Sequence, residues 1–148
     1  MRSPPRLVLV VVPDLAVREP LAEALRGGGF AVLALDDGDE ARRVLDFVLP
    51  AAVVLDARLR APTALSLLME LAFRSIPQPT VLVSSDGAAD VLSATFAIDH
   101  VALPCAARAL IAVVDRAIEE ERAPRPTEST ASLRATTVAP PLGRRSSR

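Results

Sequence analysis

The chain has 148 residues, a formal net charge of −1 and a composition that is 51% hydrophobic, 24% charged and 3% aromatic. This length suffices for one domain with a hydrophobic core, and the apolar content excludes a wholly disordered chain. The aromatic residues are four phenylalanines, too few for base stacking to be a main mode of nucleic-acid binding. No apolar run reaches the roughly 20 residues that a membrane-spanning helix needs. We therefore expect neither a nucleic-acid nor a membrane partner.

The N-terminal residues are basic and precede an apolar run, which is the arrangement of a secretory signal. That run, residues 7–12, stops at Pro13 and is shorter than the roughly 7–15 residues of a signal core. We interpret it as a buried strand of a cytoplasmic protein. The single cysteine, Cys105, cannot form an internal disulfide, and every basic side chain is Arg, so chemistry that needs a lysine is excluded.

Short apolar runs alternate with amphipathic stretches along the chain, which is typical of βαβ units and a parallel sheet. The predicted strands are residues 7–12, 30–35, 52–55, 80–83 and 100–103. The predicted helices follow Asp14, cover residues 39–48, follow Thr63, and cover residues 89–96 and 106–121. Because strands and helices alternate throughout, we predict an α/β fold.

Capping and breaking residues mark several of the helix ends. Asp14 and Thr63 are predicted N-caps, residues 27–29 (Gly-Gly-Gly) end the first helix, and Pro20 is expected to bend its first turn or delay its start. The predicted buried faces combine apolar residues at helical spacing. They are Val17, Leu21, Ala24 and Leu25; Ala41, Val44, Leu45 and Val48; Leu65, Leu68, Ala72 and Phe73; and Leu110, Val113, Ala117 and Ile118.

The composition changes after residue 121. Pro, Ser, Thr, Ala and Arg dominate residues 122–148 and apolar periodicity ends, so we predict a disordered tail behind a domain of residues 6–121. Residues 1–121 hold 11 Arg and 17 acidic residues, whereas the tail holds six Arg and one Glu. Residues 1–121 thus carry a net charge of −6 and are followed by a basic tail of net charge +5.

Functional groups of open α/β sheets gather beyond the carboxyl ends of the strands, so the residues that end each predicted strand are the candidate site. These residues are Val12, Pro13 and Asp14; Asp36 and Asp37; Asp56; Ser84 and Ser85; and Leu103 and Pro104. The Gly-Gly-Gly run lies between a helix and a strand, the reverse of a nucleotide-binding loop, and is therefore a turn.

The order of these strand ends resembles the receiver domain of bacterial response regulators. The segment VREPLAEAL (17–25) is similar to the family's first helix, and AAVVLDARL (51–59) to its third strand with the phosphoacceptor aspartate. The resemblance covers about residues 6–121. It implies a flavodoxin-like (βα)5 fold, a doubly wound five-stranded parallel sheet with strand order 2-1-3-4-5.

The resemblance assigns roles to four residues of this chain. Asp56 matches the phosphoacceptor, and Ser84 matches the hydroxyl that binds phosphoryl oxygens. His100 falls on the family's switch aromatic, and Pro104 on the proline whose preceding peptide is typically cis. From the residues alone, Ser84 fits equally well as a strand-end serine that satisfies backbone groups. His100 has no second His or Cys for a metal site, and the sequence supports no Ser–His–Asp arrangement.

Three other family positions have lost their chemistry. The acidic pair that helps to hold Mg²⁺ falls on Val12 and Pro13, and the lysine falls on Leu103. Mg²⁺ prefers hard oxygen ligands, so we expect weak Mg²⁺ binding or none, and no other cofactor. We hypothesise that the domain does not autophosphorylate at useful rates. Asp56 is then a structural acid that pairs with Arg58 or Arg60 in the next loop.

The resemblance and the losses together favour a stand-alone receiver-like signalling protein of two-component (phosphorelay) type that acts as a phosphorylation-independent interaction module and not as an enzyme. A histidine kinase or downstream effector is the expected partner, through about residues 89–121, and a homodimer is a further option. Ile111 and Val114 are the apolar residues expected to be exposed there. One alternative is a working single-domain response regulator phosphorylated on Asp56. Another is a small flavodoxin-like enzyme or cofactor binder, against which stands the lack of a phosphate-binding loop.

Overall fold

Five parallel strands form one sheet in the order β2-β1-β3-β4-β5 in the computed structural model, which describes residues 4–60, 63–74 and 78–122. The strands are β1 Leu7–Val11, β2 Ala31–Leu35, β3 Ala52–Asp56, β4 Thr80–Ser84 and β5 Asp99–Ala102. The helices are α1 Leu15–Gly27, α2 Gly38–Leu45, α3 Ala64–Ala72, α4 Ala88–Phe96 and α5 Ala107–Arg122. This confirms the predicted fold class and strand order.

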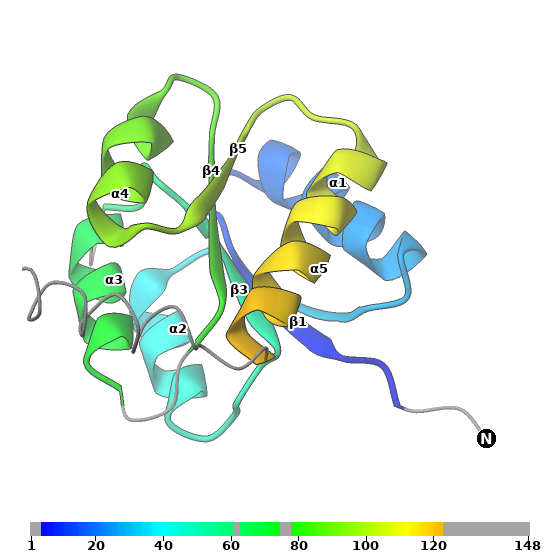
Figure 1. Ribbon diagram of the computed structural model, residues 1–148, viewed down its shortest axis with the longest axis horizontal. Helices are drawn as coiled ribbons and strands as arrows, with labels where there is room; N and C mark the ends of the chain where they lie inside the picture. Colours follow the sequence, from blue (N-terminus) through cyan, green and yellow to red (C-terminus); the bar gives the residue numbers. More distant parts are fainter. Residues whose placement is uncertain (1–3, 61–62, 75–77, 123–148) are drawn as a thin grey trace, which may run out of the picture.

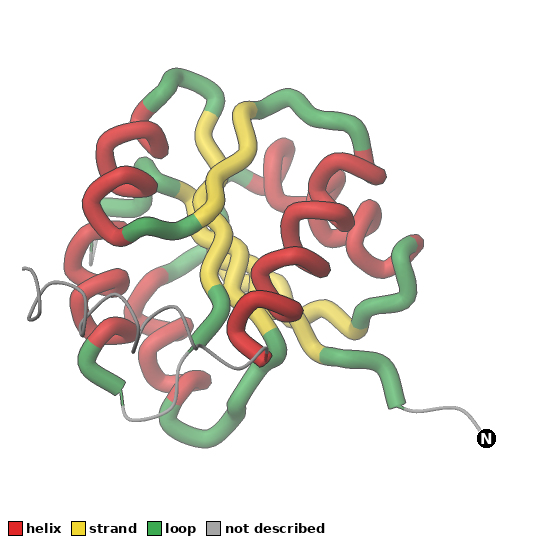
Figure 2. The backbone as a smooth tube through the Cα atoms, viewed as in Figure 1, coloured by secondary structure: helices red, strands yellow, loops and turns green. Residues whose placement is uncertain are grey.

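The helices cover both faces of the sheet, with α1 and α5 on one face and α2, α3 and α4 on the other (Figure 1). Each strand is followed by a helix that runs back across the sheet (Figure 2). The loops that leave the carboxyl ends of the strands therefore gather at one edge of the sheet. We call this edge the strand-end edge.

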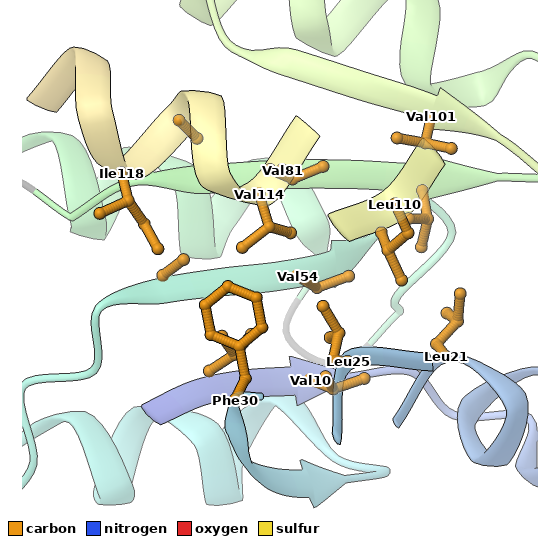
Figure 3. Close-up of a cluster of buried hydrophobic side chains, with 14 of the residues drawn as sticks. Val10, Leu21, Leu25, Phe30, Val54, Val81, Val101, Leu110, Val114 and Ile118 are labelled. Carbon is orange, nitrogen blue, oxygen red and sulfur yellow. The ribbon is translucent and has the colours of Figure 1, made fainter. Parts of the chain in front are cut away.

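The sheet separates two apolar cores because side chains alternate between its faces. On β1, Val8 and Val10 belong to the core under α1 and α5, whereas Leu9 and Val11 belong to the core under α2, α3 and α4. Figure 3 shows the first core, in which Leu110, Val114 and Ile118 of α5 point toward the strands. Strands buried on both faces are expected to be continuous apolar runs, and β1 as well as the central residues of β3 and β4 follow this pattern.

The helix α1 begins and ends at capping residues that the sequence predicts. The Asp14 carboxylate accepts the Ala16 N–H at 3.0 Å, and the N–H of the C-cap Gly28 donates to carbonyls of the last turn. Gly29 has a φ of 95°, which favours glycine. Pro20 lies inside the helix, so it does not delay the start of α1, and the expected bend stays a prediction. Pro20 is exposed and has no backbone N–H to donate.

The predicted face of α3 is wrong, and so is the predicted exposure of two residues of α5. In α3, Leu65 is 46% and Phe73 is 84% exposed. The buried residues are instead Ala64, Leu67, Leu68 and Leu71. In α5, Val114 is fully buried and Ile111 packs against the first core, so neither is an exposed partner residue as predicted.

Element ends also differ slightly from the prediction. The helix α2 ends at Leu45 and not at Val48, and α5 includes Arg122, the first residue of the predicted tail. The rest of that predicted disordered tail, residues 123–148, lies outside the described residues. Among the described helices, none combines the length and the apolar character needed to cross a membrane.

Candidate functional site

An acidic pocket of about 440 Å³ opens at the strand-end edge, beyond β1, β2 and β3. Carboxylates outnumber cationic side chains on its walls. Its charged side chains are those of Asp14, Asp36, Asp37, Asp56, Arg58 and Arg60. The structure thus brings together the ends of the first three strands, as the parallel sheet predicts, and we call this cavity the acidic pocket.

Asp56 ends β3 and is half-buried in the wall of the acidic pocket. Its Oδ1 accepts the Arg58 backbone N–H at 2.8 Å. Burial raises the pKa of the Asp56 carboxyl, the hydrogen bond and charge of Arg58 lower it, and the negative charges of Asp86 and Asp14 raise it further. The carboxylate is therefore held by the backbone in surroundings that oppose its ionisation.

The predicted side-chain pairing of Asp56 is wrong. Within residues 4–60, 63–74 and 78–122, neither Arg58 nor Arg60 forms an ion pair with Asp56. The Arg58 Nε instead lies 3.4 Å from Oδ2 of Asp86. The loop after β3 turns tightly enough for the Arg58 N–H to reach Asp56, and this directs the Arg58 guanidinium toward the loop after β4.

Asp86 holds the buried hydroxyl of Ser84. Ser84 is 2% exposed, and its Oγ donates to Asp86 Oδ1 at 2.9 Å. The Asp86 carboxylate also accepts the Ala88 N–H at 3.0 Å, and these bonds lower the pKa of the Asp86 carboxyl. Sequence reasoning missed Asp86. The signal was its place just before α4, where an aspartate commonly bonds nearby backbone N–H groups.

The end of β1 offers no oxygen ligands in place of the family's acidic pair. The Val12 side chain is fully buried in the first core, and Pro13 has no polar side chain. Asp14 follows, but its carboxylate caps α1. No cluster of three or more His, Cys, Asp or Glu suited to a metal ion occurs in the described part of the chain. The residues present therefore do not fit a Mg²⁺ site of the family's kind.

A second pocket, of about 490 Å³, lies beside Leu103, between α1 and the start of α5. Its lining side chains are apolar apart from Ser85 and Cys105, and we call it the apolar pocket. Leu103 packs against the first core, and its peptide bond to Pro104 is cis. Burial raises the pKa of the Cys105 thiol. Sequence reasoning did not foresee this cavity.

His100 lies on the outer surface of α4 and β5, away from both pockets. Its Nδ1 is 2.9 Å from Ser93 Oγ and its Nε2 is 3.1 Å from Asp90 Oδ1. The His100 side chain is 39% exposed. Asp90 and Ser93 are three residues apart, so they share one face of α4. The sequence shows this spacing but not that β5 places His100 beside it.

No family model matches the chain, and no curated protein matches it. Solved structures do. A protein from Chloroflexus aurantiacus described as a response regulator is 24% identical, with a TM-score of 0.73, over 78% of this chain and 98% of that one. NtrX from Brucella abortus is 25% identical, with a TM-score of 0.72, over 89% of this chain and 33% of its own.

The receiver domain of the sensor histidine kinase PA1611 from Pseudomonas aeruginosa is 19% identical, with a TM-score of 0.70. The match covers 78% of this chain and 98% of that domain. These structures share the strand order and the arrangement of helices on both faces of the sheet. The chain therefore has the fold of response-regulator receiver domains, as its resemblance to that family predicts.

Proposed function

We propose that this chain is a receiver-type signalling protein of the two-component kind that acts through protein contacts, without phosphorylation and without catalysis. The observation that carries the proposal is the apolar character of two strand ends. Val12 is fully buried in the first core, and Leu103 lines the apolar pocket. These are the positions at which the family has a metal-binding acid and a lysine.

The electrostatics of the acidic pocket support the proposal. A phosphoryl group on Asp56 would bring about two further negative charges into a pocket where carboxylates already outnumber guanidinium groups. The PA1611 receiver domain was solved with a magnesium ion coordinated in its active-site cleft. In this chain the corresponding strand end supplies Val12 and Pro13, which cannot neutralise that charge through a metal.

The decisive experiment is treatment of the purified protein with acetyl phosphate in Mg²⁺ or in EDTA, read by intact mass. We expect no phosphoryl adduct on the wild type or on Asp56→Asn. A Mg²⁺-dependent adduct that is absent from Asp56→Asn would refute the proposal and support the working response regulator.

A restored variant makes a negative result informative. Pro13→Asp combined with Leu103→Lys returns one acid and the lysine without touching the fully buried Val12. If the missing groups explain the inertness, this variant gains a Mg²⁺-dependent adduct on Asp56 that the wild type lacks. If it stays inert while remaining folded, the buried Val12 and the paired Arg58 are the stronger barriers.

The partner-binding half of the proposal concerns the surface of α4, β5 and α5. Ile111 and Val114 of α5 are packed inward and cannot form this contact. On α4, Val91 is a large apolar residue whose exposed fraction is 71%. Val91 lies beside the polar cluster of Asp90, Ser93 and His100. We propose this part of the surface as the contact with a kinase or an effector.

Val91→Glu tests that contact against Leu49→Glu, a matched control because Leu49 is 63% exposed and lies between α2 and β3. The wild type and both variants are compared in a quantitative pull-down against histidine kinases and response-regulator effectors from the organism that carries this protein. We expect Val91→Glu to reduce binding to its partner and Leu49→Glu to leave it unchanged. Equal effects of the two variants, or none, would place the contact elsewhere.

The retained aspartate supports a second candidate, a response regulator that accepts a phosphoryl group directly from a kinase. Asp56 is half-buried at an open pocket that Arg58 also lines, so release of the Arg58 guanidinium from its ion pair with Asp86 would supply a cation for a phosphoryl group there. Transfer from a phosphorylated histidine kinase to the wild type, absent from Asp56→Asn, would favour this candidate over the interaction module.

A further inference from the structure

The apolar pocket and the acidic pocket adjoin at the start of α1. Asp14 lines the acidic pocket, and Ala16 and Val17 line the apolar one. Leu15, between them in sequence, is 57% exposed, although it is a large apolar residue. The strand-end edge therefore presents three features side by side, namely an apolar cavity, the exposed Leu15 and a cluster of carboxylates.

The C-terminal residues of the same chain have the complementary features, an apolar segment followed by basic residues. Residues 138–142 (Val-Ala-Pro-Pro-Leu) are apolar, and Arg144 and Arg145 follow after a single glycine. From residue 143 onward the sequence holds three Arg and no acid. We propose that residues 138–145 dock on the strand-end edge of their own domain, with the apolar residues in the apolar pocket and the two arginines at the acidic pocket.

The polarity of the apolar pocket suits this occupant. Ser85 and Cys105 are its polar side chains, so it offers few partners for backbone amide groups. A buried amide N–H without a hydrogen-bond partner is costly. Pro140 and Pro141 have no amide N–H, and their fixed φ angles reduce the entropy lost on binding. A cavity of this size lies within the range that accommodates compact ligands, about 300–1,000 Å³.

The spacing of the two halves is also compatible. Leu142 and Arg144 are two residues apart, about 7 Å in extended chain. Asp14, which lines the acidic pocket, and Ala16, which lines the apolar pocket, are likewise two residues apart, so the two pockets adjoin there. One short segment can thus reach both pockets at once.

The connecting chain is long enough. The helix α5 runs from the apolar pocket to the opposite end of the molecule (Figure 1), so its 16 residues span about 24 Å. Residues 123–137 would have to return over that distance. Fifteen residues can extend to roughly 50 Å at most, so their length suffices for the span.

Charge favours the same contact over a second copy of the domain. The residues up to 121 carry a formal charge of −6 and those from 122 onward carry +5. Two domains would repel each other, whereas the C-terminal residues are attracted to the domain that bears them. Attachment to the same chain also gives an effective concentration in the millimolar range.

The single thiol is a direct reporter of the occupied pocket. Cys105 lines the apolar pocket, and the chain has no other cysteine, so its rate of reaction with Ellman's reagent measures access to the pocket. The full-length wild type is compared with Leu142→Asp and with Ala131→Asp, a control with the same charge change outside the docking segment. All three are measured at one pH.

We expect Leu142→Asp to react about tenfold faster than the wild type, the change that corresponds to about 1.4 kcal/mol of docking free energy. Ala131→Asp should react at the wild-type rate. Equal rates in all three proteins would overturn the proposal, since the pocket would then be equally open with and without a docking-competent segment.

Further measurements separate the other occupants. Arg144→Glu with Arg145→Glu should also speed the reaction, and raising the salt concentration should do so in the wild type but not in this variant. A wild-type rate that falls with rising protein concentration would assign the pocket to a second copy. Protection that survives Leu142→Asp but is lost after denaturation, dialysis and refolding would assign it to a bound small molecule. Either result would refute docking of residues 138–145.

Discussion

The two pockets at the strand-end edge differ in how each joins the rest of the molecule. The acidic pocket is bordered by loops, and its charged side chains interact with backbone groups and with one another. The apolar pocket is walled by α1 and α5 and continues into the first core through Leu21 and Leu110. The difference teaches that an apolar residue at a strand end can be accommodated in two ways: Val12 is buried in the core, and Leu103 lines a cavity.

The largest expected effect is a difference in how much the walls of the two pockets contribute to the free energy of unfolding. Leu110 is fully buried and lines the apolar pocket, so Leu110→Ala should lower the free energy of unfolding by about 2–5 kcal/mol. Arg60→Ala, in the wall of the acidic pocket, should change it by less than about 0.5 kcal/mol. Urea denaturation measures both. Similar losses in the two variants would show that the pockets do not differ in this way.

A smaller effect is expected where α1 and α5 meet. A Cβ on Gly28 would lie 2.7 Å from Ile111 Cδ1 and 2.9 Å from Cγ1. Ile111 is packed against the first core, so Gly28→Ala should cost about 1–3 kcal/mol through overpacking. Gly27→Ala is the control, because a Cβ there meets nothing within 4 Å. If both variants are equally stable, Ile111 moves aside freely and the packing of α1 against α5 is adaptable.

The smallest expected effects concern two carboxylates of the strand-end loops, and their signs are opposite. Burial raises the pKa of the Asp56 carboxyl in the folded state. The stability that its protonated form contributes to folding is therefore lost as the pH rises through that pKa. Asp56→Asn, which cannot ionise, should stabilise the protein at neutral pH. Hydrogen bonds lower the pKa of Asp86, so its contribution is present above its ordinary value of 3.8 and is lost as the pH falls through the lowered pKa. Asp86→Asn should therefore destabilise the protein at neutral pH.

Urea midpoints of the two variants at pH 7 and at pH 3 test these signs against the wild type. Both differences should shrink at the acidic pH, where the carboxyl groups are increasingly protonated. A shift of the same sign in both variants at pH 7 would mean that their mutual repulsion, and not their separate surroundings, decides their contributions.

The fold was predictable because apolar runs and turn residues agree along nearly the whole described chain. The face of α3 was not, because its sequence (ALSLLMELA) is apolar nearly all round, so periodicity does not select a side. In α5, Ile111 and Val114 were misplaced for a related reason. Several adjacent apolar residues extend the apolar stripe, and only packing against α1 decides which of them are buried.

Of the candidate site, the sequence located the strand ends but not the contacts between their loops. Asp56 was expected to pair with a side chain, yet its partner is the Arg58 backbone N–H, which depends on the turn after β3. The cluster around His100 depends on how α4 lies against β5, which no local pattern encodes, whereas the contacts of Asp86 with Ser84 and Ala88 are local. The apolar pocket requires the distance between α1 and α5, a property of the assembled fold.

The full burial of Val12 has a consequence for how this protein can evolve. Acids at the end of β1 would add like charges beside Asp14, Asp36 and Asp37, and such concentrations of charge lower the stability of a fold. An apolar side chain packed into the core at that position works in the opposite direction. It raises the free energy of unfolding further above the minimum that a protein needs to escape unfolding and degradation. Substitutions on the outer surface of α4 and β5 can then accumulate and be selected for new contacts while the fold persists.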